Sequence, residues 1–215
     1  MTTTQISIPA HHIEAALRAV SKDETRYYLA GVFIDARGFI AATNGHVAFL
    51  AICDEARKVS EDTSKLPEGI IVPSDALTLA IKASGRAAGV YVVFERDEQG
   101  QWRILYGPAS IAFTPIDGTF PDIRRILPEA PETLTAAHYD PVYIAMLGKM
   151  AAAVNGGKKG LASSFRLHQA GLAPALVTFR DQGDRVVDDC AAVIMPLRTE
   201  PSDYATPAHV SAFRY

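Results

Sequence analysis

The chain has 215 residues, of which 48% are hydrophobic and 21% charged, and its formal net charge is −3. This length allows one or two domains with a hydrophobic core. The slight acidity argues against a protein that coats nucleic acid with its whole surface, although it leaves room for a local basic stripe. No apolar run approaches the roughly 18 residues that span a bilayer, and the first residues lack a signal-peptide pattern, so we expect a cytoplasmic chain.

The first series of predicted elements covers the N-terminal quarter of the chain. An apolar strand at 6–9 leads into a helix whose apolar residues follow the spacing of one helical face. Three runs rich in apolar and β-branched or aromatic residues follow at 29–35, 38–43 and 46–53, and each predicts a strand.

The same pattern recurs from residue 70. A strand at 70–73 precedes a helix that Ser74 or Asp75 can cap, since either side chain accepts from free amides at a helix start. Strands are predicted at 90–95, 101–106 and 110–115, with a hairpin turn at 97–100. The charged, polar segment 54–68 reads as the connection between the two series.

A third and looser series completes the pattern. It has a short strand at 133–136, a helix with Asp140 as N-cap and Pro141 in the first turn, and three strands. The strands are predicted at 163–169, 175–180 and 190–197. The whole chain therefore predicts an α+β fold of three βαβββ repeats.

Four separated motifs carry the functional signal. They are Arg26-Tyr27-Tyr28-Leu29-Ala30-Gly31, Thr43-Asn44-Gly45-His46, Phe120-Pro121-Asp122-Ile123-Arg124-Arg125-Ile126-Leu127-Pro128 and Val193-Ile194-Met195-Pro196-Leu197-Arg198. In this order they resemble the bacterial DNA sliding clamp, the DNA polymerase III beta subunit, in a shortened bacterial or phage form.

The resemblance implies a domain organisation and an assembly. Residues 1–127 would form a clamp-like domain of two βαβββ halves, 128–198 half of another such domain, and 199–215 a flexible tail. A third half without an intrachain partner would expose strand edges, so we expect a homo-oligomer. Clamps of this family form rings that encircle DNA. This chain resembles only one and a half of the family's three domains, which puts a closed ring in doubt.

The resemblance also implies a pocket for short peptides of the replicative polymerase or the clamp loader. Its residues would form an apolar floor, two proline walls and a rim of donors. They would be Leu29, Thr43, Gly45, His46, Pro121, Arg125, Ile126, Val193, Met195, Pro196 and Leu197. Judged by composition alone, these residues would be ordinary core residues at a domain junction. The resemblance in the four motifs favours the peptide pocket instead.

Duplex DNA would lie against the helices. The candidate contacts are Arg18, Lys22, Arg26, Tyr28, Lys82, Arg86 and Lys149, with Lys158 and Lys159 in a following glycine-rich loop. Arg18 and Lys22, and Lys82 and Arg86, are like-charged pairs four residues apart, a spacing that repels unless an anion faces it. Cations in the last turn of a helix also complement its dipole, so this ordinary explanation stays open. Any DNA contact should be to phosphate, without sequence preference and steeply salt-dependent.

Catalytic and metal sites are not expected. Cys53 and Cys190 lie in apolar stretches and should be buried thiols without a cofactor or metal. Neighbouring His11 and His12 would point about 100° apart on a helix, and no further ligand cluster follows them. A set of Cys190, Asp189 and His46 would need the fold to bring it together, and the glycine-rich run 155–160 lacks the phosphate-loop spacing.

Two interpretations of the function remain. The first is a non-catalytic processivity factor that presents the peptide pocket and contacts duplex DNA. The second is a clamp-like adaptor or decoy that binds replication proteins without encircling DNA. The tail adds a hypothesis, because Val210 and Phe213 in 209–213 are similar to the anchors of the family's partner peptide, of Gln-Leu-Ser-Leu-Phe type. The competing interpretation is that the tail 199–215 is a flexible C-terminal segment without a function.

Overall fold

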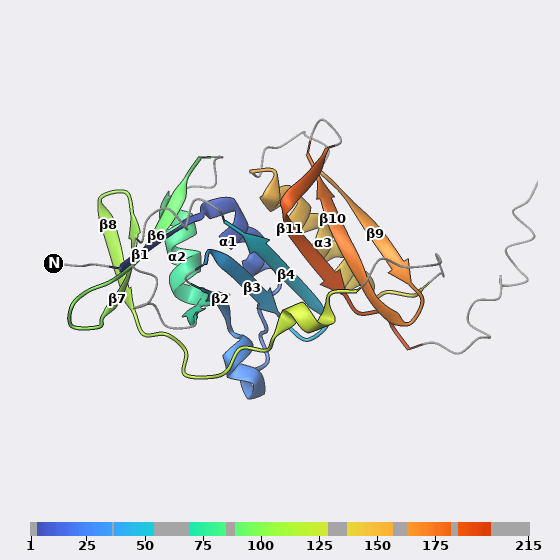
Figure 1. The fold of residues 1–215 in the computed structure, drawn as a ribbon, viewed down its shortest axis with the longest axis horizontal. Helices are drawn as coiled ribbons and strands as arrows, with labels where there is room; N and C mark the ends of the chain where they lie inside the picture. Colours follow the sequence, from blue (N-terminus) through green and yellow to red (C-terminus); the bar gives the residue numbers. More distant parts are fainter. Residues whose placement is uncertain are drawn as a thin grey trace, which may run out of the picture.

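A computed structural model describes residues 4–35, 37–53, 69–84, 89–128, 137–156, 163–181 and 185–198. The elements follow one another as αβββ series, the first two of them opened by a strand (Figure 1). The first series is β1 (Thr4–Pro9), α1 (Ala10–Leu17), η1 (Glu24–Leu29), β2 (Gly31–Ile34), β3 (Phe39–Thr43) and β4 (Val47–Ile52). The second is β5 (Ile70–Pro73), α2 (Ser74–Ser84), β6 (Tyr91–Arg96), β7 (Trp102–Tyr106) and β8 (Ala109–Phe113). After η4 (Ile123–Ile126) come α3 (Pro141–Val154), β9 (Ser164–Ala170), β10 (Ala173–Arg180) and β11 (Val186–Ile194).

The first two series exchange their opening strands. One antiparallel sheet has the order β1-β6-β7-β8, and the other has the order β5-β2-β3-β4-β11-β10-β9. Ile8 of β1 lies opposite Val92 of β6, and Val32 of β2 lies opposite Val72 of β5. Strand β1 of the first series therefore lies in the sheet of the second series, and β5 of the second series lies in the sheet of the first.

The third series joins the larger sheet through β11. Cys190 pairs with Ala51 and Val193 with Ala48 along the antiparallel β4–β11 ladder. The larger sheet thus continues past the predicted boundary at residue 127. The division into a domain of 1–127 and a half domain of 128–198 stays a prediction.

The main core lies between the helices and one face of the sheets. Helix α1 packs against both α2 and α3. The buried cluster joins residues of these helices to alternate strand residues such as Phe49, Phe94 and Phe179, as expected where one face of a sheet is covered. None of the helices in the described residues is both long and apolar enough to cross a bilayer.

Local signals that the sequence carries are confirmed. The Asp140 side chain accepts from the amide of Val142 at 2.8 Å and caps α3. The predicted hairpin turn closes with a 2.9 Å bond from the Gly100 amide to the Asp97 carbonyl, and Gly100 adopts a φ of +84°. The expected burial of Cys53 and Cys190 is also found.

Some predicted boundaries are wrong. Residues 29 and 30 are not in a strand, because η1 fills 24–29 and Asp23 caps it by accepting from the Thr25 amide. Strand β11 ends at Ile194 instead of Leu197, since Pro196 has no amide proton to continue a ladder. The strand expected at 133–136, the connection 54–68 and the tail 199–215 lie outside the described residues.

Candidate functional site

The segment that follows β8 lies on the sheet face that the helices leave uncovered. Ile123 is buried there in a second apolar cluster with Ala48, Leu50 and Val193. Phe120 stacks on Phe33, with ring centroids 5.2 Å apart. These contacts attach the 116–128 connector to β2, β4 and β11.

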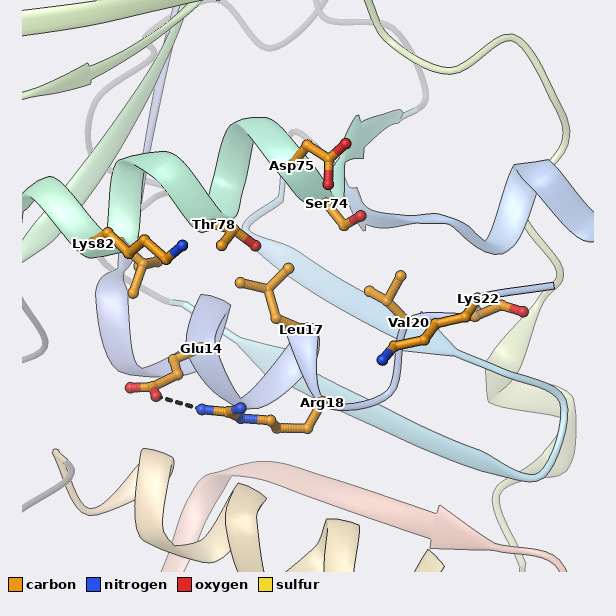
Figure 2. A pocket seen from close by; sticks show the side chains of 11 residues that line it. Glu14, Leu17, Arg18, Val20, Lys22, Ser74, Asp75, Thr78 and Lys82 are labelled. Carbon is orange, nitrogen blue, oxygen red and sulfur yellow. Dashed lines mark hydrogen bonds and ion pairs between the residues drawn. The ribbon is translucent and has the colours of Figure 1, made fainter. Parts of the chain in front are cut away.

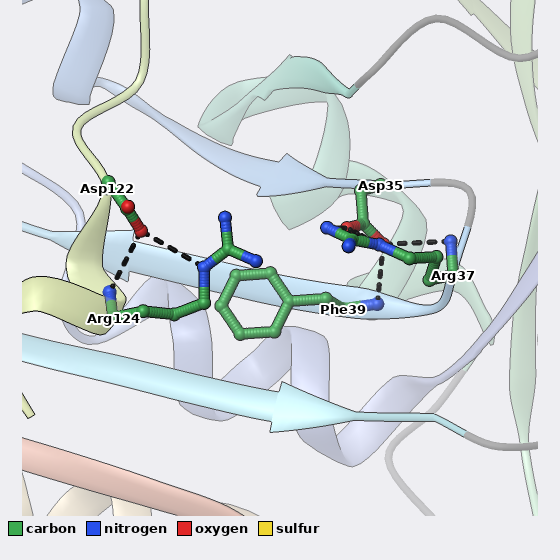
Figure 3. A network of polar contacts seen from close by, with 5 residues as sticks. All are labelled: Asp35, Arg37, Phe39, Asp122 and Arg124. Atoms are coloured by element: carbon green, nitrogen blue, oxygen red, sulfur yellow. Dashed lines mark hydrogen bonds and ion pairs between the residues drawn. The ribbon is translucent and has the colours of Figure 1, made fainter.

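Charged side chains hold the same connector in place (Figure 3). Asp122 accepts from the backbone amide of Arg124 at 3.3 Å and from its Nε at 3.0 Å, and so caps η4. The hydrogen bonds to Arg124 lower the pKa of Asp122 below its usual range. The Arg124 guanidinium lies 5.8 Å from the ring centroid of Phe39 on β3, a cation–π contact.

The β2–β3 turn that carries Phe39 is fixed by a buried carboxylate. Asp35 accepts from the amides of Arg37 and Phe39, at 2.8 and 3.0 Å. It also accepts from two nitrogens of the Arg37 guanidinium, at 2.9 and 2.6 Å (Figure 3). Since Asp35 is 1% exposed, these bonds compensate for the burial of its charge.

The β3–β4 turn presents three of the predicted peptide-site residues. Thr43 Oγ1 donates to the Val47 carbonyl and accepts from the Gly45 amide. Gly45 has a φ of +90°, and a Cβ there would lie 2.6 Å from a guanidinium nitrogen of Arg26. The positive φ therefore favours glycine at this turn, whereas the flexible end of Arg26 could move away from a side chain there. His46 follows it and is exposed.

The end of β11 and the start of α3 meet this turn. The Met195 amide donates to the His46 carbonyl at 2.9 Å, and the Leu197 amide to the His138 carbonyl at 2.8 Å. The His46 ring stacks on Tyr143 of α3, with centroids 5.0 Å apart and planes inclined by 14°. The spacing of Tyr143 along the helix does not signal this stack.

The predicted peptide-site residues separate into two groups by exposure. Leu29, Thr43 and Val193 are buried and Pro196 is half-buried, whereas the exposed residues are Gly45, His46, Pro121, Arg125, Ile126, Met195 and Leu197. A hydrogen bond joins Met195 to His46, which directly follows Gly45 in the β3–β4 turn. Leu197 lies two residues after Met195 and bonds to His138. Pro121, Arg125 and Ile126 lie on the connector, whose Ile123 touches the cluster of Val193. Leu29 is linked to the turn through Arg26 of the same 3-10 helix.

On the opposite side of the sheets, a cavity of about 530 Å³ lies between α1 and α2 (Figure 2). It has an apolar floor and a mixed charged rim. The lining residues are Glu14, Leu17, Arg18, Val20, Ser21, Lys22, Ser74, Asp75, Thr78, Ile81 and Lys82. Three of the predicted DNA contacts, Arg18, Lys22 and Lys82, therefore share one groove.

The other predicted DNA contacts have different positions. Lys149 is exposed on α3, and Arg86, Lys158 and Lys159 lie outside the described residues. Arg26 pairs with Asp23 at 2.9 Å and lies against the β3–β4 turn instead of the groove. Tyr28 is half-buried beneath Gly118, whereas its neighbour Tyr27 is 56% exposed.

A polar cluster that the sequence did not predict lies at the first turn of α1. His12, Asp189 and Cys190 each offer one possible ligand atom, and these atoms lie within 4.8 Å of one another. The His12 ring lowers the pKa of Asp189, while burial and the neighbouring carboxylate raise the pKa of Cys190. Local helix geometry could not reveal this cluster, because Asp189 and Cys190 arrive through the β4–β11 pairing. His46 lies at the far end of that ladder, beside Met195 and not beside Cys190, so the nucleophile set considered above is not formed.

Comparisons with known proteins confirm the resemblance found in the motifs. No family model matches the chain. Two curated beta sliding clamps of Caulobacter vibrioides strains are 28% identical over 116 residues, which cover 51% of this chain and 30% of each relative. The chain thus matches less than a third of the length of these relatives.

Solved structures support the same fold over most of the chain. The sliding clamp of Bartonella birtlesii has a TM-score of 0.67 at 18% identity and aligns with 91% of this chain and 66% of its own. The clamp of Caulobacter crescentus scores 0.57 at 20% identity, covering 93% of this chain and 68% of that one. The Bacillus subtilis clamp scores 0.57 at 16% identity, covering 91% and 64%. The predicted α+β clamp fold is therefore confirmed.

Proposed function

We propose that this chain is a non-catalytic, cytoplasmic, clamp-like replication factor that contacts duplex DNA and presents a peptide-binding site to a polymerase or clamp loader. The observation that carries this proposal is the sequence similarity to beta sliding clamps together with the clamp fold over 91% of the chain. The activity of those proteins is extended here to a chain that matches 30% of the curated relatives' length.

DNA contact is proposed for the helix side of the molecule. Arg18, Lys22 and Lys82 line one groove between α1 and α2, and Lys149 is exposed on α3, which packs against α1. Arg18 and Lys22 follow the end of α1, and Lys82 lies in the last turn of α2. Long cationic side chains suit phosphate contacts that hold a duplex without reading its sequence.

Peptide binding is proposed for the opposite side, around the β3–β4 turn and the end of β11. Met195 and Leu197 are 37% and 44% exposed next to the His46–Tyr143 stack. Ile126 on the connector is 36% exposed. Exposed apolar side chains beside a ring and backbone groups offer anchors for a short apolar peptide.

Self-association is the third part of the proposal. Among the described strands, β5 and β9 end the larger sheet, and β1 and β8 end the smaller one. Free strand edges favour pairing with a further chain. A homo-oligomer would bring several helix surfaces and peptide sites into one assembly.

The groove can be tested by measuring duplex affinity across a range of salt concentrations. We expect Lys22→Ala and Lys82→Ala each to weaken binding and to reduce the salt slope by about 0.9 for each lost phosphate contact. Arg103→Ala serves as the matched control, since Arg103 is an exposed cation on β7. Equal slopes in all three variants would refute DNA contact at the groove.

A second candidate function is the adaptor that binds replication proteins without DNA. Two carboxylates in the groove favour it: Glu14 holds Arg18 at 2.7 Å, and Asp75 lines the same cavity. The salt titration also separates the two candidates, because the adaptor needs no affinity for duplex DNA.

A further inference from the structure

His12, Asp189 and Cys190 lie close together and offer the nitrogen, oxygen and sulfur ligands that a metal ion such as zinc binds. The His12 ring is 1% exposed, and its Nε2 lies 3.3 Å from Oδ2 of Asp189. This nitrogen is buried without a well-directed hydrogen bond among the described residues. On the other side of the ring, Nδ1 lies 3.4 Å from Sγ of Cys53.

The spacing of these atoms suits a tetrahedral zinc ion. Bonds of about 2.0 to 2.2 Å to nitrogen and oxygen and about 2.3 Å to sulfur separate neighbouring ligands by roughly 3.3 to 3.7 Å. The His12–Asp189 distance already has this value. The ligand atoms of His12, Asp189 and Cys190 all lie within 4.8 Å of one another. The remaining difference from zinc spacing therefore involves the Cys190 sulfur, and an ion would have to draw it closer to the His12–Asp189 pair.

We propose that His12 Nε2, an Asp189 carboxylate oxygen and Cys190 Sγ bind one zinc ion, with a water molecule as the fourth ligand. The Nδ1–H of His12 would then donate a hydrogen bond to Cys53 Sγ, which fixes the tautomer that leaves Nε2 free for the metal. Metal-binding histidines usually have such a partner on the second nitrogen. Binding converts the Cys190 thiol to a thiolate and releases its proton to solvent.

Two features favour metal binding over a nucleophilic thiol. Cys53 and Cys190 are 4% and 7% exposed, so neither sulfur is presented to a substrate. The exposed group of the cluster is the carboxylate of Asp189, which also lines a cavity of about 260 Å³ next to His12 and Cys53. A small cation and a water molecule can enter by this route, and the carboxylate would meet them first.

The site goes beyond the proposed replication function, because it would join the first turn of α1 to β11. These elements belong to opposite sides of the predicted boundary at residue 127. A zinc ion would therefore stabilise the packing between the two parts, as structural zinc does when its ligands come from separate elements.

The test uses the full chain after removal of metals, titrated with zinc in competition with a chromophoric chelator. We expect one zinc ion per chain, and Cys190→Ser, Asp189→Asn and His12→Gln should each weaken binding by at least about 100-fold. Asp188→Asn is the matched control, because it removes the neighbouring exposed carboxylate. It should leave the affinity unchanged, and Cys53→Ser, which alters the partner of His12 Nδ1, should weaken it by about 10- to 100-fold.

Cobalt binding by the unmodified chain gives a measurement that does not depend on variants folding. The Co²⁺ complex should show a thiolate-to-metal charge-transfer band, and this band should vanish in Cys190→Ser. A cobalt spectrum without that band, or zinc affinities that are equal in the three ligand variants and the control, would overturn the proposal.

Discussion

Glu14→Gln should strengthen DNA binding, because the Glu14 carboxylate pairs with Arg18, one of three cations that line the groove. Its carboxylate holds the Arg18 guanidinium at 2.7 Å, with side-chain exposures of 7% for Glu14 and 37% for Arg18. Removing the negative charge releases Arg18 toward solvent and raises the charge of the groove by one. The perturbation therefore adds one potential phosphate contact.

The magnitude follows from counterion release. One more phosphate contact makes the slope of log affinity against log salt steeper by about 0.9, which corresponds to roughly 5- to 10-fold tighter binding near 0.1 M salt. The fold should tolerate the change, since glutamine keeps a hydrogen-bond acceptor for Arg18. We expect a loss of at most about 1 kcal/mol of unfolding free energy.

Fluorescence anisotropy of a labelled duplex over a salt series measures both quantities. Glu98→Gln is the matched control, because it removes an equal charge from the exposed β6–β7 turn. If Glu14→Gln and Glu98→Gln give the same slope and affinity as the unmodified chain, the groove does not hold phosphate and the reasoning fails.

Three further predictions concern the turn, the connector and the tail. Asp35→Ala should lower the free energy of unfolding in a denaturant titration by about 1 to 3 kcal/mol, because it leaves the amides of Arg37 and Phe39 without their acceptor; an unchanged midpoint would contradict this. The pKa of Asp122 is lowered by Arg124, so its stabilising contribution is present above the ordinary carboxylate pKa and lost as the pH falls through the folded value. Asp122→Asn should therefore flatten the acid limb of the stability profile, and an identical limb would argue against the cap. Deletion of residues 200–215 should tighten binding of a partner peptide several-fold if the tail competes for the site, whereas identical affinities would remove support for the competition.

Much of the fold could be predicted because its signals are local. The alternation of apolar residues and the cap at Asp140 depend on neighbours within a few residues, and the structure keeps them. The exchange of β1 and β5 between the sheets depends on pairing over long separations, which no local pattern encodes. The strand predicted at 29–35 began too early, because the 3-10 helix that Asp23 caps runs to Leu29.

The candidate sites show the same division. Motif order was sufficient to select residues such as His46 and Met195, which a hydrogen bond joins. It could not separate buried Leu29 from exposed Met195, since both are apolar. The cluster of His12 and Cys190 was missed because its members meet only through the pairing of β4 with β11.

Calorimetric titration with a peptide of Gln-Leu-Ser-Leu-Phe type tests the central claim most directly. We predict saturable binding that Met195→Ala weakens by about 1 to 3 kcal/mol. Leu172→Ala, which removes an apolar side chain that is 61% exposed on the β9–β10 turn, should leave the affinity unchanged. Absence of binding by the unmodified chain, or equal affinities for all three proteins, would contradict the clamp-like peptide site.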